Sequence, residues 1–122
     1  MPTTRMESQL AASHSAPPMI RGKKLGMLVS ARPEQPNFQR ALRLAEAALT
    51  EGVEVYFYCI DEAVLGLREV RLQELKQRRM KLFACALAAR RRNLPVNDDA
   101  VFAGLSVVHE IMAETDRFVS FN

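Results

Sequence analysis

Apolar and polar residues follow one another along the chain in blocks that predict strands and helices in turn. Two short, continuous apolar runs, at 25–30 and 53–60, are typical of strands covered on both faces of a sheet. The second run is rich in β-branched and aromatic residues, which favour strands. Between the two runs, apolar residues recur at helical spacing and predict one buried helix face, formed by Phe38, Ala41, Leu42, Ala45 and Leu49. Asn37 is the expected N-cap of this helix, and Gly52 is its expected C′ residue.

The second half of the chain continues the alternation. Helix-forming residues at 62–78 predict a helix with a poor apolar stripe, and the run at 80–84 predicts a third strand. A helix is expected at about 85–92, and residues 117–121 form the last predicted strand. Between them, a further helix is predicted from one apolar face, formed by Val101, Leu105, Val108 and Met112. Strands joined by helices pair in parallel, so the sequence predicts an α/β domain with helices on both faces of one sheet.

The N-terminal segment differs from the rest of the chain. Its residues are polar, rich in Ser, Thr, Ala and Pro, and show no sustained period. We therefore expect a flexible tail over residues 1–21, followed by a single domain over residues 22–122. A chain of 122 residues with 48% hydrophobic and 25% charged residues can bury one core. The net charge of +3 is compatible with acidic partners but does not require them.

Two cysteines, 26 positions apart and outside any Cys-x-x-Cys motif, exclude both a disulfide framework and a zinc site. Free thiols persist in a reducing compartment, and we expect a cytoplasmic location. No apolar run reaches the roughly 18–20 residues of a membrane span, and the N-terminus lacks the apolar core of a secretory signal.

Cys85 is the strongest candidate for a reactive residue. It stands between the strand predicted at 80–84 and the helix predicted at about 85–92. The free N–H groups and the dipole of a helix N-terminus favour an anion, and the thiolate is the nucleophilic form of cysteine. Open α/β sheets also carry their working sites at the carboxyl ends of the strands. These features predict a sulfur nucleophile at Cys85. The alternative from the local sequence is a buried cysteine that packs as a small hydrophobic residue.

Three motifs in the second half of the chain point to a known family. The pattern Cys-x-x-x-Ala-x-Arg-Arg-x-Leu runs from Cys85 to Leu94, and Ala-Gly-Leu-Ser-x-x-x-x-Ile runs from Ala103 to Ile111. The last motif is Thr-Asp-Arg-Phe-Val-Ser-Phe, which ends at Phe121. With these motifs, the chain resembles the DsrE/TusD-type sulfur relay proteins, a family of intracellular sulfurtransferases, over roughly residues 23–122.

The resemblance implies a small flavodoxin-like three-layer α/β sandwich with a mainly parallel sheet, assembled as a homotrimer or homohexamer. It also implies that Cys85 is the catalytic residue, which accepts sulfane sulfur as a persulfide and relays it to a protein acceptor. A small TusA-like sulfur-carrier protein would be the donor or the acceptor, with no membrane and no direct nucleic acid as partner. This exchange between sulfur atoms needs neither a metal nor an organic cofactor. The chain departs from the family pattern at Asn93, where members usually have glycine, and in a shorter segment between the second and third strands.

Cys59 is a weaker candidate, as a resolving cysteine. In a sheet with the strand order 2-1-3, the first strand would lie between the two cysteines, and their separation would be about 9.6 Å. A disulfide needs Cα atoms within roughly 7 Å of each other. We therefore expect Cys59 to fill the core.

Two further features leave alternatives open. The arginines at 90–92, together with Arg78 and Arg79, either attract an acidic carrier protein or form solvated helix ends. His109 is either a general base or a half-buried helix residue, and no second histidine follows at metalloprotease spacing.

Two other functions remain as alternatives to sulfur transfer. The loop at 30–36 follows the first strand, where flavodoxins bind a phosphate, but it has two prolines and no glycine, which argues against a bound flavin. The other alternative is a non-catalytic oligomeric α/β subunit or binding module of a sulfur-metabolism complex.

Overall fold

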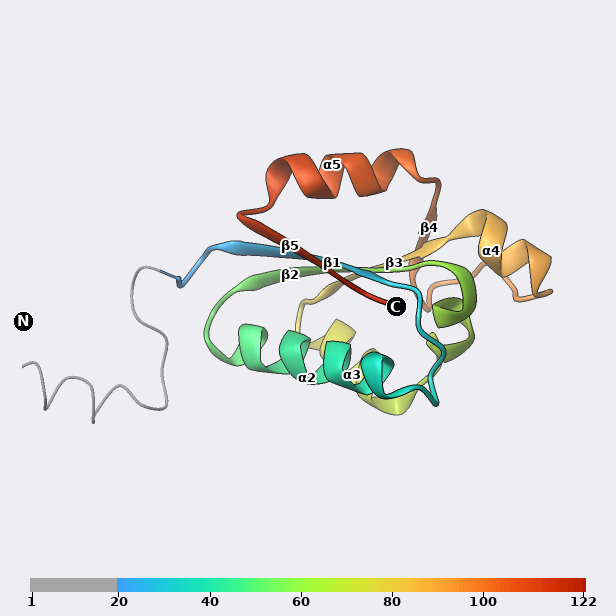
Figure 1. Cartoon of the computed structure of the whole chain (residues 1–122), viewed down its shortest axis with the longest axis horizontal. Helices are drawn as coiled ribbons and strands as arrows, with labels where there is room; N and C mark the ends of the chain where they lie inside the picture. The colour runs from blue at the N-terminus through green and yellow to red at the C-terminus, as the bar shows by residue number, and fades with distance from the viewer. Residues whose placement is uncertain (1–19) are drawn as a thin grey trace, which may run out of the picture.

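The computed structural model describes residues 20–122. Its strands are β1 (Lys24–Val29), β2 (Glu54–Cys59), β3 (Lys81–Cys85), β4 (Val101–Ala103) and β5 (Arg117–Phe121). Its helices are α2 (Pro36–Thr50), the 3-10 helix η2 (Asp61–Gly66), α3 (Val70–Gln77), α4 (Ala86–Arg91) and α5 (Ser106–Glu114). The sheet is the middle of three layers, with α5 on one face and α2 and α3 on the other (Figure 1). The predicted α/β sandwich is therefore confirmed. The predicted tail lies almost wholly outside the described residues and stays a prediction.

All five strands are parallel, in the order β4-β3-β2-β1-β5. From β1 the chain adds β2, β3 and β4 in one direction, and it then returns across the sheet to place β5 beside β1. Crossovers between parallel strands are right-handed, so the returning helix α5 lies on the opposite face from α2 and α3. The order 2-1-3 was wrong, because β3 pairs with β2 and not with β1.

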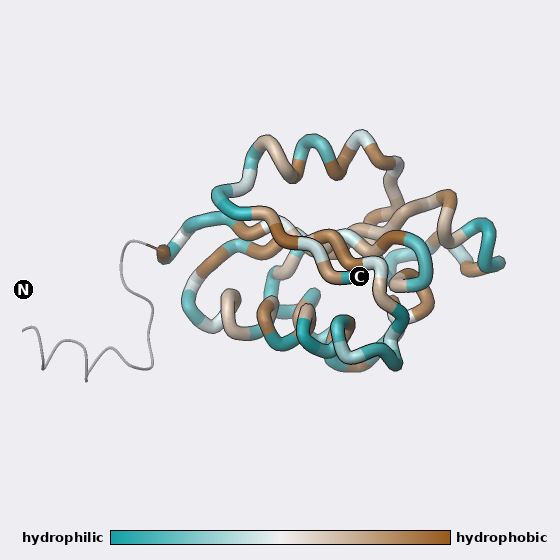
Figure 2. Tube along the Cα trace, in the orientation of Figure 1, coloured by the Kyte–Doolittle hydropathy of each residue, from teal (hydrophilic) through white to brown (hydrophobic). Residues whose placement is uncertain are grey.

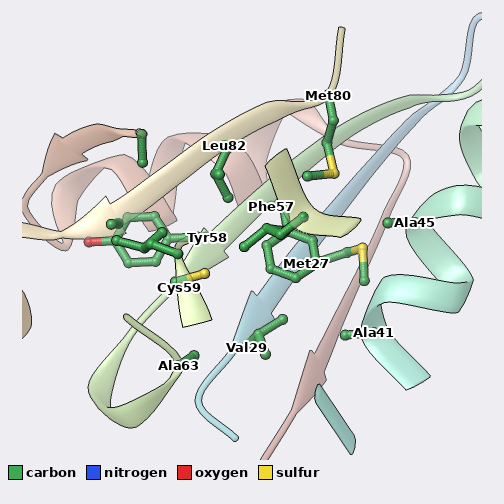
Figure 3. Packing of buried hydrophobic residues seen from close by; sticks show 14 of the residues in the cluster. Met27, Val29, Ala41, Ala45, Phe57, Tyr58, Cys59, Ala63, Met80 and Leu82 are labelled. Carbon is green, nitrogen blue, oxygen red and sulfur yellow. The ribbon is translucent and has the colours of Figure 1, made fainter. Parts of the chain in front are cut away.

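The helix predicted after the first strand is α2, and its apolar face is buried as expected. Its buried residues are Phe38, Ala41, Leu42 and Ala45. In Figure 3, Ala41 and Ala45 face Met27 and Phe57 of the sheet. Figure 2 shows the hydrophobic residues gathered along the strands, with hydrophilic residues frequent on the outer helices and loops.

The ends of α2 agree with the sequence at one cap and differ at the other. Gly52 has φ +83°, a left-handed conformation that favours glycine after a helix. The N-cap is Gln35 and not Asn37, because Pro36 is well suited to the first helical position. Asn37 lies within the helix, and its side-chain amide donates a hydrogen bond to the carbonyl oxygen of Asn122 over 2.8 Å.

The segment predicted as one helix over 62–78 forms two elements, η2 and α3. Gly66, at the end of η2, packs so closely on α2 that a Cβ there would lie 2.5 Å from Cζ of Phe38. The chain then turns, and α3 buries Leu72 and Leu75 against the core. The contact with Phe38 thus explains why a glycine stands at the break.

The helix predicted from Val101 begins later than expected. Residues Val101–Ala103 form the edge strand β4, which pairs with β3, and α5 begins at Ser106. Three apolar residues in a row fit a strand as well as a helix, and pairing with β3 decides the outcome.

Candidate functional site

Cys85 occupies the position that the sequence predicted for it. It ends β3 and is the N-cap of α4, with extended backbone angles of φ −68° and ψ 117°. Its Sγ accepts a hydrogen bond from the backbone N–H of Ala88 over 3.4 Å. The residue is 6% exposed. The sulfur is therefore held by the first turn of a helix at the carboxyl edge of the sheet.

A pocket of about 500 Å³ lies beside Cys85, where β2, β3 and β4 end. Its walls combine apolar and charged side chains from η2, α4 and the loops around them. Besides Cys85 and Ala88, the lining residues are Ile60, Asp61, Leu87, Arg91, Arg92 and Leu105. Two guanidinium groups against one carboxylate favour a negatively charged ligand near the sulfur. Leu87 and Leu105 are also exposed at the surface, so the pocket has an apolar rim.

The arginines do not form one cluster. Arg91 and Arg92 line the pocket, and Nη1 of Arg92 donates to the carbonyl oxygen of Ala88 over 3.1 Å. Arg78 and Arg79 precede β3 and so lie at the amino end of the strand that carries Cys85 at its other end. Arg78 forms an ion pair with Glu46 of α2, at 3.9 Å. Only Arg91 and Arg92 among the five arginines considered from the sequence belong to the pocket.

Tyr58 of β2 is a residue of this site that the sequence did not indicate. It is fully buried, and its hydroxyl donates a hydrogen bond to the carbonyl oxygen of Ala103 over 2.9 Å. Ala103 is the partner of Cys85 in the pairing of β3 with β4. Burial raises the pKa of Tyr58 above its usual value, and the charge of Cys85 raises that pKa further. Tyr58 thus links β2 to β4 at the carboxyl end of β3.

Cys59 lies in the core, as expected, but β1 does not separate it from Cys85. β2 and β3 are neighbours, and Cys59 is the register partner of Ala84, one residue before Cys85. Successive side chains of a strand point to opposite faces, so the two thiols lie on opposite sides of the sheet. Both cysteines are free. Cys59 is 0% exposed, and burial raises its pKa above the usual value of a thiol. Figure 3 shows it beside Ala63 among the hydrophobic residues.

Asn93 departs from the family pattern without disturbing the backbone. Its φ of 57° lies in the left-handed region, which asparagine tolerates better than most residues. The backbone N–H groups of Asn93 and Leu94 donate to the carbonyl oxygens of Arg90 and Ala89, over 3.1 and 2.9 Å. These bonds close the end of α4, as the glycine usual in the family would.

The other features considered from the sequence lie outside this site. His109 is exposed on α5, and His14 lies outside the described residues. Within residues 20–122, no group of three or more His, Cys, Asp or Glu side chains could hold a metal ion. The loop at 30–36 is bound to the C-terminal residue through Ser30, whose hydroxyl donates a hydrogen bond to Oδ1 of Asn122 over 3.0 Å.

Among the helices of the described region, none combines the length and apolar character needed to cross a membrane.

Comparison with known proteins agrees with the geometry. The chain is similar to the YchN protein from E. coli, whose crystal structure superposes with a TM-score of 0.68. The two share 18% sequence identity, and the match covers 82% of this chain and 99% of that one, which shows a common fold. No curated protein matches the sequence. A family profile, that of the DsrE/DsrF-like family, matches residues 23–121. The chain therefore belongs to the DsrE/DsrF-like family, which connects it with sulfur relay.

Proposed function

We propose that this protein is a sulfur carrier, or sulfurtransferase, that accepts sulfane sulfur as a persulfide on Cys85 and passes it to a protein acceptor. The single observation that carries the proposal is the position of Cys85 in a chain of this family. Cys85 lines a pocket together with Arg91 and Arg92, and its sulfur accepts a hydrogen bond from Ala88 N–H. A hydrogen bond from a backbone N–H stabilises the thiolate, which is the form that attacks sulfur.

The reaction consists of two displacements at sulfur. In the first, the Cys85 thiolate attacks the outer sulfur of a donor persulfide, a new S–S bond forms, and the donor leaves as a thiolate. In the second, an acceptor thiolate attacks the outer sulfur of the Cys85 persulfide, and Cys85 leaves as a thiolate. The proton on the outer sulfur travels with that sulfur in both steps. No net oxidation occurs, so neither a metal nor a cofactor is required.

The surface around the pocket supports a protein partner. Arg91 and Arg92 provide positive charge, and Leu87 and Leu105 provide exposed apolar area around the sulfur. A small acidic carrier protein of TusA type fits this combination as donor or acceptor, because charge guides the encounter and apolar contacts hold the complex. A homotrimer or homohexamer in the cytoplasm is part of the same proposal.

One observation favours a second candidate function. Cys85 is only 6% exposed, and a non-catalytic oligomeric subunit of a sulfur-metabolism complex could keep its thiol covered in this way. The carrier function requires the sulfur to become accessible through the pocket. Reactivity of Cys85 in the folded protein therefore separates the two functions.

The test is the intact mass of the protein after incubation with polysulfide. Uptake of one sulfur atom adds about 32 Da, and peptide mapping should place it on Cys85. Cys85→Ser should abolish the adduct while the domain stays folded, because a serine hydroxyl can cap α4 in the same way. Cys59→Ala is the matched control and should keep the adduct. A folded wild-type protein that takes up no sulfur would refute the carrier function and favour the non-catalytic subunit.

A further inference from the structure

Tyr58 has a buried polar group with a defined partner at the reactive end of β3. Of the two tyrosines in the chain, Tyr56 has its hydroxyl in an exposed contact with Glu54 at 3.4 Å. The Tyr58 hydroxyl instead lies inside the protein, 2.9 Å from the carbonyl oxygen of Ala103. Figure 3 shows this hydroxyl pointing away from the sulfur of Cys59.

The strand register places the Tyr58 hydroxyl near Cys85. Tyr58 is the register partner of Phe83, and Cys85 follows Phe83 by two residues on the same face of the sheet. Ala103 is the partner of Cys85 on the far side, in β4. The side chain of Tyr58 therefore crosses β3, and its hydroxyl ends at the carbonyl oxygen of Ala103, next to Cys85 in the sheet.

We infer that Tyr58 is a positioning residue that stabilises the Cys85 thiolate by turning its hydroxyl proton from the Ala103 carbonyl to Sγ when the thiol ionises. A phenol has one proton to donate, so it bonds to the stronger acceptor. A thiolate carries a full charge and is a stronger acceptor than a neutral peptide carbonyl. The Ala103 carbonyl is the resting partner, which keeps the hydroxyl in place while Cys85 is protonated.

The hydroxyl remains a donor throughout the pH range in which thiols titrate. Burial, and then the charge of Cys85 itself, raise the pKa of Tyr58, so the phenol keeps its proton to a higher pH than an exposed tyrosine does. A phenol that keeps its proton is a donor to a neighbouring thiolate and not a competing anion.

Other charged groups line the same pocket as Cys85 and act alongside the tyrosine. Arg91 and Arg92 of α4 favour the thiolate, and Asp61 of η2 opposes it, because all three line the pocket with Cys85. Cys59, on the opposite face of the sheet, remains protonated because it is buried. These groups are unchanged when Tyr58 is replaced by phenylalanine, so that substitution isolates the hydroxyl.

The consequence for sulfur transfer rests on the proposed function. Both displacements pass through the Cys85 thiolate, as the attacking group in uptake and as the leaving group in release. A donor that stabilises this thiolate increases the fraction of Cys85 ready to attack and makes its departure easier.

The experiment measures the rate at which iodoacetamide alkylates Cys85 between pH 6 and 10, in wild type, Tyr58→Phe and Tyr56→Phe. Loss of one hydrogen bond to a charged group should raise the pH of half-maximal rate by about one unit in Tyr58→Phe. At a fixed pH below that point, alkylation should be about tenfold slower. Tyr56→Phe should titrate as wild type does. Identical profiles for all three proteins, each folded by circular dichroism, would overturn the inference.

A second measurement does not depend on the folding of Tyr58→Phe. In protein labelled with ¹³C at the ζ carbon of tyrosine, the two signals are assigned by the loss of one in Tyr56→Phe. The Tyr58 signal of wild type should shift at the same pH as the alkylation midpoint of Cys85, and this shift should vanish in Cys85→Ala. A Tyr58 signal that is constant with pH in wild type would refute the inference.

The two experiments distinguish this inference from the proposed function. Alkylation reports on the thiolate alone and needs no sulfur donor. A wild-type protein that shows the Tyr58 effect but takes up no sulfur would refute the carrier function and leave the tyrosine's role intact.

Discussion

The two cysteines should differ in reactivity by at least about a thousandfold, although they lie on neighbouring strands. Cys59 is 0% exposed within β2, which is paired on both sides, so a reagent reaches it only when the sheet opens. Core strands open at nearly the full free energy of unfolding, and even a marginal value of about 5 kcal/mol slows the reaction by more than three powers of ten. Cys85 needs a much smaller movement, because it caps the six-residue helix α4 beside an open pocket.

The assay uses the two single-cysteine proteins. Cys59→Ala leaves Cys85, Cys85→Ser leaves Cys59, and each is treated with iodoacetamide at pH 8 and followed by intact mass. Cys85 should react within minutes, while Cys59 should react only on the timescale of unfolding, and denaturant should abolish the difference. If Cys59 reacts within tenfold of Cys85 in folded protein, burial of the thiol does not control reactivity as argued. Sulfur from polysulfide that mapped to Cys59 would contradict the assignment of the site directly.

Three further predictions concern stability and assembly. Because burial raises the pKa of Cys59 in the folded state, the unfolded chain ionises first, near pH 8.5, and above that pH the free energy of unfolding should fall by up to about 1.4 kcal/mol per unit. Urea denaturation at pH 8 and pH 10 should show a larger decrease in the free energy of unfolding for wild type than for Cys59→Ala. An equal decrease in the two proteins would contradict this role of Cys59. Gly66→Ala should cost about 2 kcal/mol, because the added Cβ meets Phe38 at 2.5 Å, whereas Gly104→Ala, with nothing within 4 Å, should change stability by less than about 0.5 kcal/mol. Similar melting temperatures for the two alanine variants would refute that contrast. The edge strand β4 leaves Val101 59% exposed, and light scattering should show a trimer or hexamer; a 13.7 kDa monomer at micromolar concentration would rule this assembly out.

The sequence determined the features that depend on neighbouring residues. The strands at 25–30, 53–60, 80–84 and 117–121 were predicted close to their observed bounds, because continuous apolar runs reveal buried strands. The buried face of α2 followed from apolar residues at helical spacing. Cys85 was placed at the junction of β3 and α4 for the same reason: a short apolar run and an alanine-rich run meet there.

The tertiary structure alone decided which of these elements lie side by side. Strand order leaves no trace in a local pattern, so the expectation of β1 between the two cysteines was wrong, and their true separation onto opposite faces follows from the register of β2 with β3. The strand β4 forms because the edge of β3 offers its backbone groups to Val101–Ala103. Tyr58 looked like any aromatic strand residue in the sequence. Its hydroxyl reaches Ala103, the register partner of Cys85, only because residues far apart along the chain are brought to the same edge of the sheet. That proximity is a product of packing, which no local pattern records.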